Sequence, residues 1–175
     1  MASDTNLNIK KLIYDWIIPI VSAVVIAIII NKFFVFKIFI PSGSMTPTIN
    51  VDDRLFVSRI YNYNNLDRGD IIVFYSNEFQ ESMIKRLIGL PGDIVEIKNG
   101  VVYVNKEELI EDYVIEKDDY SGYFEVPEGK YFFLGDNRKN SKDSRYWENP
   151  YISEKDIEGK AQIRVYPFKD FGKVK

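Results

Sequence analysis

The hydrophobic pattern of the chain begins with a nearly continuous apolar stretch at residues 12–30. Only four positions interrupt it: Tyr14, Asp15, Pro19 and Ser22. As an α-helix this stretch would be roughly 28 Å long, about the thickness of the hydrocarbon core of a bilayer. The pattern therefore predicts a transmembrane anchor at residues 12–32, preceded by a short tail at residues 1–11.

A cleaved signal peptide and a buried core helix are the alternatives to an anchor. A signal peptide needs small residues of the A-x-A kind after its apolar part. Asn31, Lys32 and the bulky residues 33–36 follow instead, so we expect the segment to stay attached. Lysines on its two sides balance each other, and the positive-inside rule therefore does not decide which end faces the cytoplasm.

Residues 33–40 (FFVFKIFI) are too rich in aromatic and β-branched side chains for a helix and too apolar for a free linker. We interpret them as a strand that ends at Pro41 and holds the next residues close to the bilayer surface. Short apolar or alternating runs then recur along the chain, as expected for β-strands. They lie at residues 55–58, 70–75, 83–90, 93–98, 101–104, 131–134 and 161–166.

The part of the chain after the anchor, residues 33–175, is therefore predicted to be one mainly β domain. Asn99-Gly100 lies between two of the runs and favours the positive φ angles of a type I′ turn, which predicts a hairpin at residues 94–104. Helical signal is weak, and the best is a short turn at residues 153–157 with Ser153 at its cap position. Residues 105–122 are charged and poorly patterned, which predicts a small surface excursion from the β core.

The composition excludes several classes of chemistry. The 175 residues include no Cys and no His, which rules out disulfides, thiol nucleophiles, His bases and nearly all His- or Cys-ligated metal sites. We expect neither a metal nor another cofactor. The net charge is -3 and the basic residues are scattered, so nucleic acid is not an expected partner. An enzyme of this composition must take its general base from Lys, Asp, Glu or Tyr.

A loop with two hydroxyl groups directly follows the first predicted strand. Its sequence is Pro41-Ser42-Gly43-Ser44-Met45. Two serines around a glycine often form nothing more than a turn. So close to a membrane, however, serine is of little use unless its hydroxyl is needed, and Gly43 lets the backbone present both the Oγ and the N–H of Ser44. Ser44 is therefore a candidate nucleophile.

Lys85 is the candidate base for this serine. In a strand its side chain shares a face with Met83 and Leu87, whereas Arg86 lies on the other face. An ordinary lysine has a pKa of about 10.4, and burial between apolar neighbours lowers that pKa because it disfavours the charged form. The alternative is a lysine that extends its ammonium group into water from an edge strand.

A third polar cluster, GDNRKNSKDSRYW, occupies residues 135–147. A solvated surface loop is one interpretation. The other is a loop ordered by hydrogen bonds and ion pairs, in which an arginine keeps each of two aspartates ionised and Ser141 orients a lysine amine. Arg138 and Arg145 are the arginines expected to keep Asp136 and Asp143 ionised. By itself the cluster is compatible with both interpretations.

Four motifs, taken in order, closely resemble those of type I signal peptidases. They are PSGSM at residues 41–45, RGD at 68–70, KRLIGLPGD at 85–93 and the cluster at 135–147. Their order and spacing match as well, and the resemblance extends from the anchor to Tyr166. It implies a membrane-bound serine endopeptidase with a Ser–Lys dyad. It also implies a core of coiled antiparallel β-sheets with one N-terminal transmembrane helix.

The resemblance implies catalytic roles at the matching positions. Ser44 would be the nucleophile, and Lys85 the general base that later activates the water for deacylation. The Ser42 hydroxyl and the Ser44 N–H would form the oxyanion hole. Ser141 would hold the Lys85 amine in place.

The resemblance also implies supporting roles. Asp143 and Arg145 would pair and brace the loop, and Asp136, Arg138 and Arg86 would be structural.

Substrates and location follow from the same resemblance. The substrates would be signal peptides of exported preproteins, cut where small residues occupy the first and third positions before the scissile bond. The N-terminus would be cytoplasmic and the catalytic domain extracytoplasmic, with the lipid bilayer as the other partner. One anchor and a short excursion resemble the compact form found in Gram-positive bacteria.

Three other functions are compatible with parts of the sequence. One is a Ser–Lys processing peptidase with a single dedicated substrate. Another is a membrane-tethered β scaffold without catalysis, in which Ser44 and Lys85 need not meet. The third is an aspartic protease built on Asp136 and Asp143, which the neighbouring arginines disfavour because they would keep both carboxylates ionised.

Overall fold

The computed structural model describes residue 11 and residues 13–174, which form two units divided after residue 36. In the first unit a π-helical turn, η1 (Ile13–Ile17), continues into the helix α2 (Ile18–Phe33). Together they make one apolar helix of 21 residues, all of them exposed, which is long enough to cross a membrane. The single N-terminal apolar helix predicted from the sequence is thus confirmed. Of the predicted tail, only Lys11 lies within the described residues.

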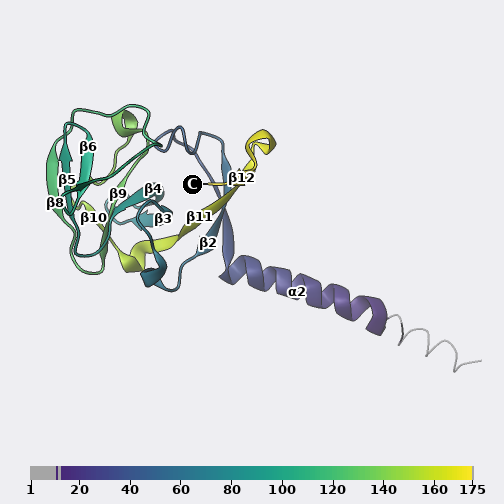
Figure 1. The fold of residues 1–175 in the computed structure, drawn as a ribbon. Coiled ribbons are helices and arrows are strands. Elements are labelled where there is room, and N and C mark those ends of the chain that lie inside the picture. Colours follow the sequence, from purple (N-terminus) through teal and green to yellow (C-terminus); the bar gives the residue numbers. More distant parts are fainter. Residues whose placement is uncertain (1–10, 12, 175) are drawn as a thin grey trace, which may run out of the picture. The chain divides into compact units, whose positions relative to one another are not determined.

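The second unit contains two sheets (Figure 1). The strands of the larger sheet are β1 (Val35–Phe39), β2 (Arg54–Arg59), β3 (Ile71–Ser76), β4 (Glu81–Gly89), β9 (Lys130–Leu134), β10 (Tyr151–Ser153), β11 (Ile157–Tyr166) and β12 (Gly172–Lys173). Its strand order is β1-β2-β11-β3-β4-β9-β10, and β12 pairs with β11. The smaller sheet has the order β7-β6-β5-β8, with β5 (Ile94–Lys98), β6 (Val101–Val104), β7 (Glu107–Glu108) and β8 (Gly122–Glu125).

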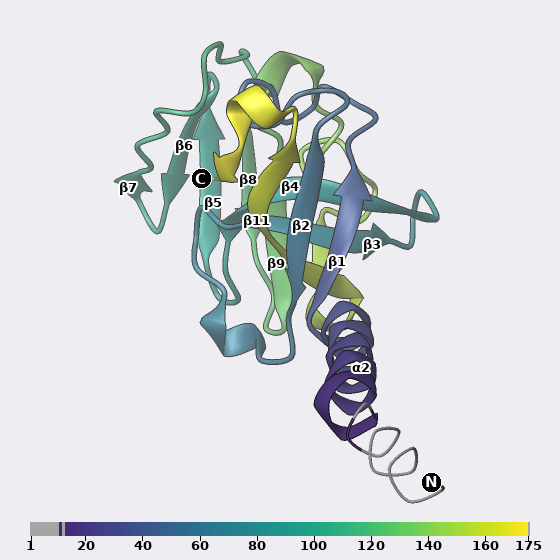
Figure 2. The ribbon, with the colours of Figure 1, turned by 90° about the vertical axis from the view of Figure 1, so that its right-hand side faces the viewer.

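The larger sheet is strongly coiled. Its pairings from β2 to β10 are antiparallel, and β3 and β4 run across the direction of β2 and β11 (Figure 2). Register shifts along β11 mark bulges, at Ile157/Gly159 against β3 and at Ala161/Ile163 against β2. Bulges increase the local twist of a strand, so β11 can pair with β2 and β3 although these two run in different directions.

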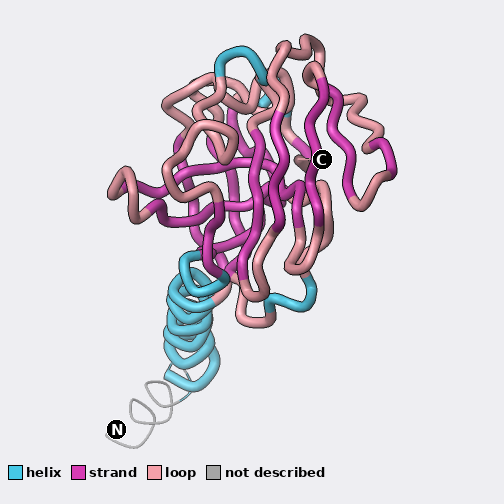
Figure 3. Tube along the Cα trace, turned by 90° about the vertical axis from the view of Figure 1, so that its left-hand side faces the viewer, coloured by secondary structure: helices cyan, strands magenta, loops and turns pink. Residues whose placement is uncertain are grey.

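Strands are the main regular secondary structure of the second unit, as the sequence predicts (Figure 3). The largest difference is β11, which begins at Ile157 although the pattern indicates a start at residue 161. Ile157, Gly159 and Ala161 are the buried positions of its first half. Because Gly and Ala carry little hydrophobic signal, the alternation is invisible in the sequence. The missed strands β7, β8, β10 and β12 are two to four residues long, too short for a periodic pattern.

Two turns were predicted from particular residues. Asn99 and Gly100 both have positive φ, and Lys98 pairs with Val101, so the two-residue hairpin turn is confirmed. The helical turn near Ser153 is a 3-10 turn, η4 (Glu154–Asp156). Ser153 occupies its cap position without a side-chain hydrogen bond, so the predicted cap is wrong. The other 3-10 turns are η2 (Tyr63–Asn65), η3 (Arg138–Asn140) and η5 (Phe168–Asp170).

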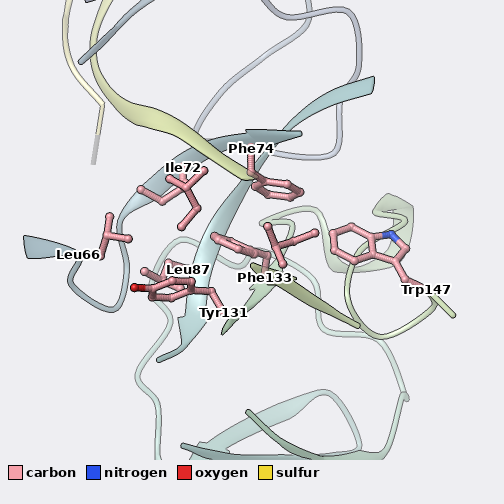
Figure 4. Packing of buried hydrophobic residues seen from close by; sticks show 9 residues of the cluster. Leu66, Ile72, Phe74, Leu87, Tyr131, Phe133 and Trp147 are labelled. Atoms are coloured by element: carbon pink, nitrogen blue, oxygen red, sulfur yellow. The ribbon is translucent and has the colours of Figure 1, made fainter. Parts of the chain in front are cut away.

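Three clusters of buried side chains hold the β unit together. In the first, the Phe74 and Phe133 rings stack with centroids 4.5 Å apart, and Trp147 meets Phe74 edge-on (Figure 4). The second fills the space between the smaller sheet and β9. The third contains Ile40, Met45 and Ile49 and lies under the loop that follows β1. This third cluster places the candidate nucleophile, because Ser44 directly precedes Met45.

We expect Phe133→Ala to lower the free energy of unfolding by about 3–5 kcal/mol, since it removes a fully buried ring and leaves a cavity. Urea denaturation of the β unit within the full chain would measure the loss. Phe171→Ala is the matched control, because 66% of that side chain is exposed, and it should change stability by less than about 1 kcal/mol. Equal losses in the two variants would contradict the assignment of Phe133 to the core.

Candidate active site

The loop that carries Ser44 is fixed by its apolar neighbours. Met45 and Ile49 are buried in the third cluster, and the Ile49 N–H donates to Met45 O. At the start of the loop the Ile40 N–H donates to Asp53 O, and the Asp52 N–H donates to Ile40 O. Ser44 is therefore held by packing on its C-terminal side, although hydroxyl-rich loops are usually mobile.

Lys85 lies in the middle of β4, with β3 on one side and β9 on the other. It is opposite Ile72 in the register of β3 and β4, and its side chain is only 3% exposed. The strand alternation correctly placed it inward rather than in water. Arg86 is also buried, since β4 is covered on both faces at this point.

The two candidate catalytic groups are in contact. The Nζ of Lys85 lies 2.7 Å from the Oγ of Ser44 and donates a second hydrogen bond, of 3.1 Å, to Ile84 O. Burial lowers the pKa of Lys85 to about 8, and the nearby carboxylates of Asp143, Glu81 and Asp136 oppose the shift. An amine with this pKa is neutral in a useful fraction of molecules near neutral pH, so it can accept a proton from Ser44.

Asn137 connects the 135–147 loop to the Ser44 loop. Its backbone N–H donates to Ser44 O over 3.1 Å, and its side-chain amide donates to Gly43 O over 3.0 Å. Because Gly43 O and the Ser44 N–H belong to one planar peptide group, the second bond also fixes the direction in which this N–H points. The sequence offered Asn137 within a motif but gave it no role.

Two buried ion pairs support the site. Arg86 binds Asp136 through two hydrogen bonds of 2.8 and 2.6 Å, and Arg145 binds Asp143 through two of 2.7 and 2.8 Å. Asp136 lies two residues beyond Leu134, which is the partner of Arg86 across β4 and β9. The carboxylate therefore emerges on the same face of the sheet as Arg86. Asp143 also accepts the backbone N–H of Gly135, which ties the two ends of the loop together.

Arg138 does not pair with Asp136 through its side chain, contrary to the pairing expected from the sequence. Its guanidinium binds both carboxylate oxygens of Glu111 instead, and its Nε donates to Gly135 O. The two side chains are almost completely buried. Nearness in sequence suggested Asp136, but that carboxylate is already saturated by Arg86 and by the Thr48 hydroxyl.

Ser42 and Ser141 complete the set of predicted residues. Ser42 lies in the exposed part of the loop, two residues before Ser44. Ser141 is buried, and its hydroxyl makes no hydrogen bond within residues 11 and 13–174. Burying a hydroxyl without a partner costs free energy, so this orphaned group is a candidate for a role in the reaction.

Gly135 allows the two loops to approach each other. A Cβ at this position would lie 2.1 Å from Ser141 Oγ and 2.6 Å from Ser44 O. Neither Ser44 nor Ser141 can move away easily to make space for a Cβ, because Ser44 is fixed by packing and Ser141 is buried. The motif thus needs a glycine here for close approach, although its φ is not positive.

The arrangement supports nucleophilic chemistry and argues against an aspartic mechanism. Each candidate aspartate is bound by its own arginine, so the two carboxylates do not share a proton. The serine and the lysine amine are within hydrogen-bonding distance, which a scaffold without catalysis would not require.

Comparisons with known proteins show the family to which the chain is similar. A family model described as signal peptidase, peptidase S26, matches residues 13–166. A protein of Leptolyngbya laminosa named signal peptidase I is 41% identical over 162 residues, which cover 87% of this chain and 79% of that protein. A signal peptidase I of Bacillus licheniformis is 35% identical over 185 residues, which cover 99% of each. A crystal structure of a signal peptidase I from Enterococcus faecalis is 38% identical with a TM-score of 0.48, covering 55% of this chain and 96% of that one.

The pKa of Lys85 leads to an expected pH dependence. The rate at which a reactive ester acylates Ser44 should rise with pH through a midpoint near the Lys85 pKa of about 8, because only the neutral amine accepts the proton. Stopped-flow measurement from about pH 6 to about pH 11.5 would give the profile. A midpoint at the ordinary lysine value of about 10.4 would contradict the burial of the base.

The close approach at Gly135 leads to a second expectation. Gly135→Ala should slow acylation of Ser44 by about 100-fold or more, since the added methyl group must push the Ser44 loop away from Lys85. Gly69→Ala serves as the control for the added methyl group, because nothing lies within 4 Å of its Cβ position. The φ of Gly69 is +94°, so this substitution strains the backbone without causing a clash. If Gly135→Ala acylates Ser44 at the wild-type rate, the Ser44 loop and the loop of Ser141 can accommodate the methyl group, and the expectation is wrong.

Proposed function

Because the chain belongs to the signal peptidase family, peptidase S26, we propose that Ser44 is its nucleophile and Lys85 its general base. The function of the chain is that of a signal peptidase I, a serine endopeptidase that cleaves signal peptides. The observation that carries the proposed residue roles is the 2.7 Å contact between Lys85 Nζ and Ser44 Oγ in a buried environment.

In the proposed reaction the neutral Lys85 amine removes the Ser44 proton as Oγ attacks the carbonyl carbon before the scissile bond. The tetrahedral intermediate then collapses, and the Lys85 ammonium gives that proton to the leaving amine of the mature protein. This leaves Ser44 esterified with the signal peptide. The neutral amine next takes a proton from water, whose hydroxide attacks the ester, and finally returns the proton to Ser44.

The oxyanion of the tetrahedral intermediate would be bound by the Ser44 N–H and the Ser42 hydroxyl. The Asn137 side chain supports this role because it fixes the peptide group to which the Ser44 N–H belongs. Ser42 lies in the exposed part of the same loop, where its hydroxyl can turn toward a bound substrate.

The other predicted residues have supporting roles in this proposal. Ser141 would orient the Lys85 amine. The two groups are not hydrogen-bonded in the structure, and the buried Ser141 hydroxyl, which has no partner among the described residues, is free to take up this role. Arg145 and Asp143 would brace the loop that carries Ser141. Arg86, Asp136 and Arg138 would be structural, as their complete burial and pairing suggest.

The N-terminal apolar helix is consistent with single-pass anchoring in a membrane. In the proposed arrangement residues 1–11 are cytoplasmic, residues 12–32 span the bilayer, and residues 33–175 are an extracytoplasmic catalytic domain. The proposed substrates are preproteins with small residues at the first and third positions before the cut.

We expect detergent-solubilised wild type to cleave a preprotein carrying Ala at these two positions, whereas Ser44→Ala and Lys85→Ala should be at least about 1,000-fold slower. Lys85→Arg should be equally inactive in a folded protein, because a guanidinium does not give up its proton. Gel analysis of the processed product would measure the rates.

The outcomes separate the remaining functions. Processing by wild type, Ser44→Ala and Lys85→Ala alike would point to another nucleophile, and turnover by a folded Lys85→Arg protein would rule out Lys85 as base. If wild type cleaves no general preprotein although Ser44 is readily acylated, the substrate is a dedicated one.

A further inference from the structure

In the charged segment at residues 105–122, the side chains of Glu111 and Tyr113 point into the β unit. The Glu111 side chain is 2% exposed, and its carboxylate binds Arg138 through both oxygens. The Tyr113 hydroxyl donates to the same carboxylate over 2.8 Å. A buried carboxylate costs free energy unless it is fully paired. The contacts of Glu111 with Arg138 and Tyr113 therefore fix the position of this segment.

One set of contacts leads from Glu111 to Ser44. Arg138, bound by Glu111, donates from Nε to Gly135 O over 3.0 Å and so fixes both ends of the short turn between them. Asn137 lies inside this turn and makes the two hydrogen bonds that hold Gly43 O and Ser44 O. A shift of Arg138 would therefore move Asn137, and with it the peptide group that carries the Ser44 N–H.

A second set of contacts leads to Lys85. The centre of the Tyr113 ring lies 3.8 Å from the guanidinium carbon of Arg86, a stacked cation–π contact. Arg86 is the neighbour of Lys85 in β4 and binds Asp136. Because the Tyr113 hydroxyl is held by Glu111, the position of the ring depends on the same carboxylate.

We propose that Glu111 and Tyr113 are positioning residues that fix the separation between Ser44 and Lys85. They hold the turn that supports Ser44, and they hold Arg86, which lies beside Lys85. The proposal rests on the Ser44 and Lys85 roles given above. An apolar contact of the same size would serve stability as well as a buried ion pair does. The bidentate Glu111–Arg138 pair adds a defined direction, which an apolar contact lacks.

A double-mutant cycle between Glu111 and Asn137 tests this proposal, with kcat and KM for a preprotein as the readout. In the full-length protein we expect Glu111→Gln to lower kcat by about 30-fold or more and to leave KM within about threefold. In an Asn137→Ala background the same substitution should lower kcat by less than about threefold, because Glu111 acts on Ser44 through Asn137. Thermal unfolding of every variant gives the folded fraction by which kcat is divided.

Two further variants sharpen the comparison. Glu116→Gln is the matched control from the same segment: its carboxylate pairs with Lys139, both groups are largely exposed, and kcat should stay within about twofold. Tyr113→Phe removes only the hydroxyl and keeps the ring, so it remains informative if Glu111→Gln fails to fold. We expect it to lower kcat about fivefold both with and without Asn137→Ala, because the Tyr113 ring acts on Lys85 through Arg86 and not through Asn137.

Equal losses of kcat from Glu111→Gln in the two backgrounds, together with no loss from Tyr113→Phe, would overturn the proposal and leave Glu111 and Tyr113 as stabilising residues only. So would a loss that vanishes when kcat is divided by the folded fraction. Failure of the Ser44 and Lys85 assignment is distinct, because it would appear as cleavage by Ser44→Ala.

Discussion

The site depends on one interaction, the contact between a lysine amine and a serine hydroxyl inside a folded β domain. Lowering the Lys85 pKa from about 10.4 to about 8 corresponds to about 3 kcal/mol of preference for the neutral amine, and burial is the main cause. Two neighbouring strands and the loop after β9 provide this burial. In the proposed mechanism the sheet therefore supplies the base that a histidine provides in other serine proteases, and the chain contains no histidine.

Burial of the amine creates an electrostatic difficulty that the surrounding ion pairs resolve. Asp143 and Asp136 lie close enough to Lys85 to raise its pKa, which would keep it protonated. Arg145 and Arg86 bind these carboxylates through two hydrogen bonds each and offset much of their negative charge. In the proposed mechanism the arginines thus order the loop and keep the amine usable as a base. The segment at residues 105–122 contacts the same two arginines, since Tyr113 stacks on Arg86 and Asp118 binds Arg145.

The sequence allowed the centre of the site and the Asp143–Arg145 pair to be predicted, but not the other supports. Strand alternation placed Lys85 inward, and Asn99-Gly100 marked a hairpin, because both signals are local. The Glu111–Arg138 pair joins residues 27 positions apart, and Glu111 lies in a charged stretch that resembles a solvated surface loop. Arg138 was assigned to Asp136 because the two are neighbours in sequence. Only the register of β4 and β9 shows that Asp136 belongs to Arg86.

The most direct test of a buried neutral base is titration of the Lys85 amine itself. In protein with isotope-labelled lysine side chains, the Nζ resonance of Lys85 can be assigned as the signal that is lost in Lys85→Met and followed by NMR. We expect a midpoint near the pKa of about 8, below the ordinary lysine value of about 10.4. A Lys85 midpoint at that ordinary value would mean that the amine is solvated and charged, and would contradict the mechanism.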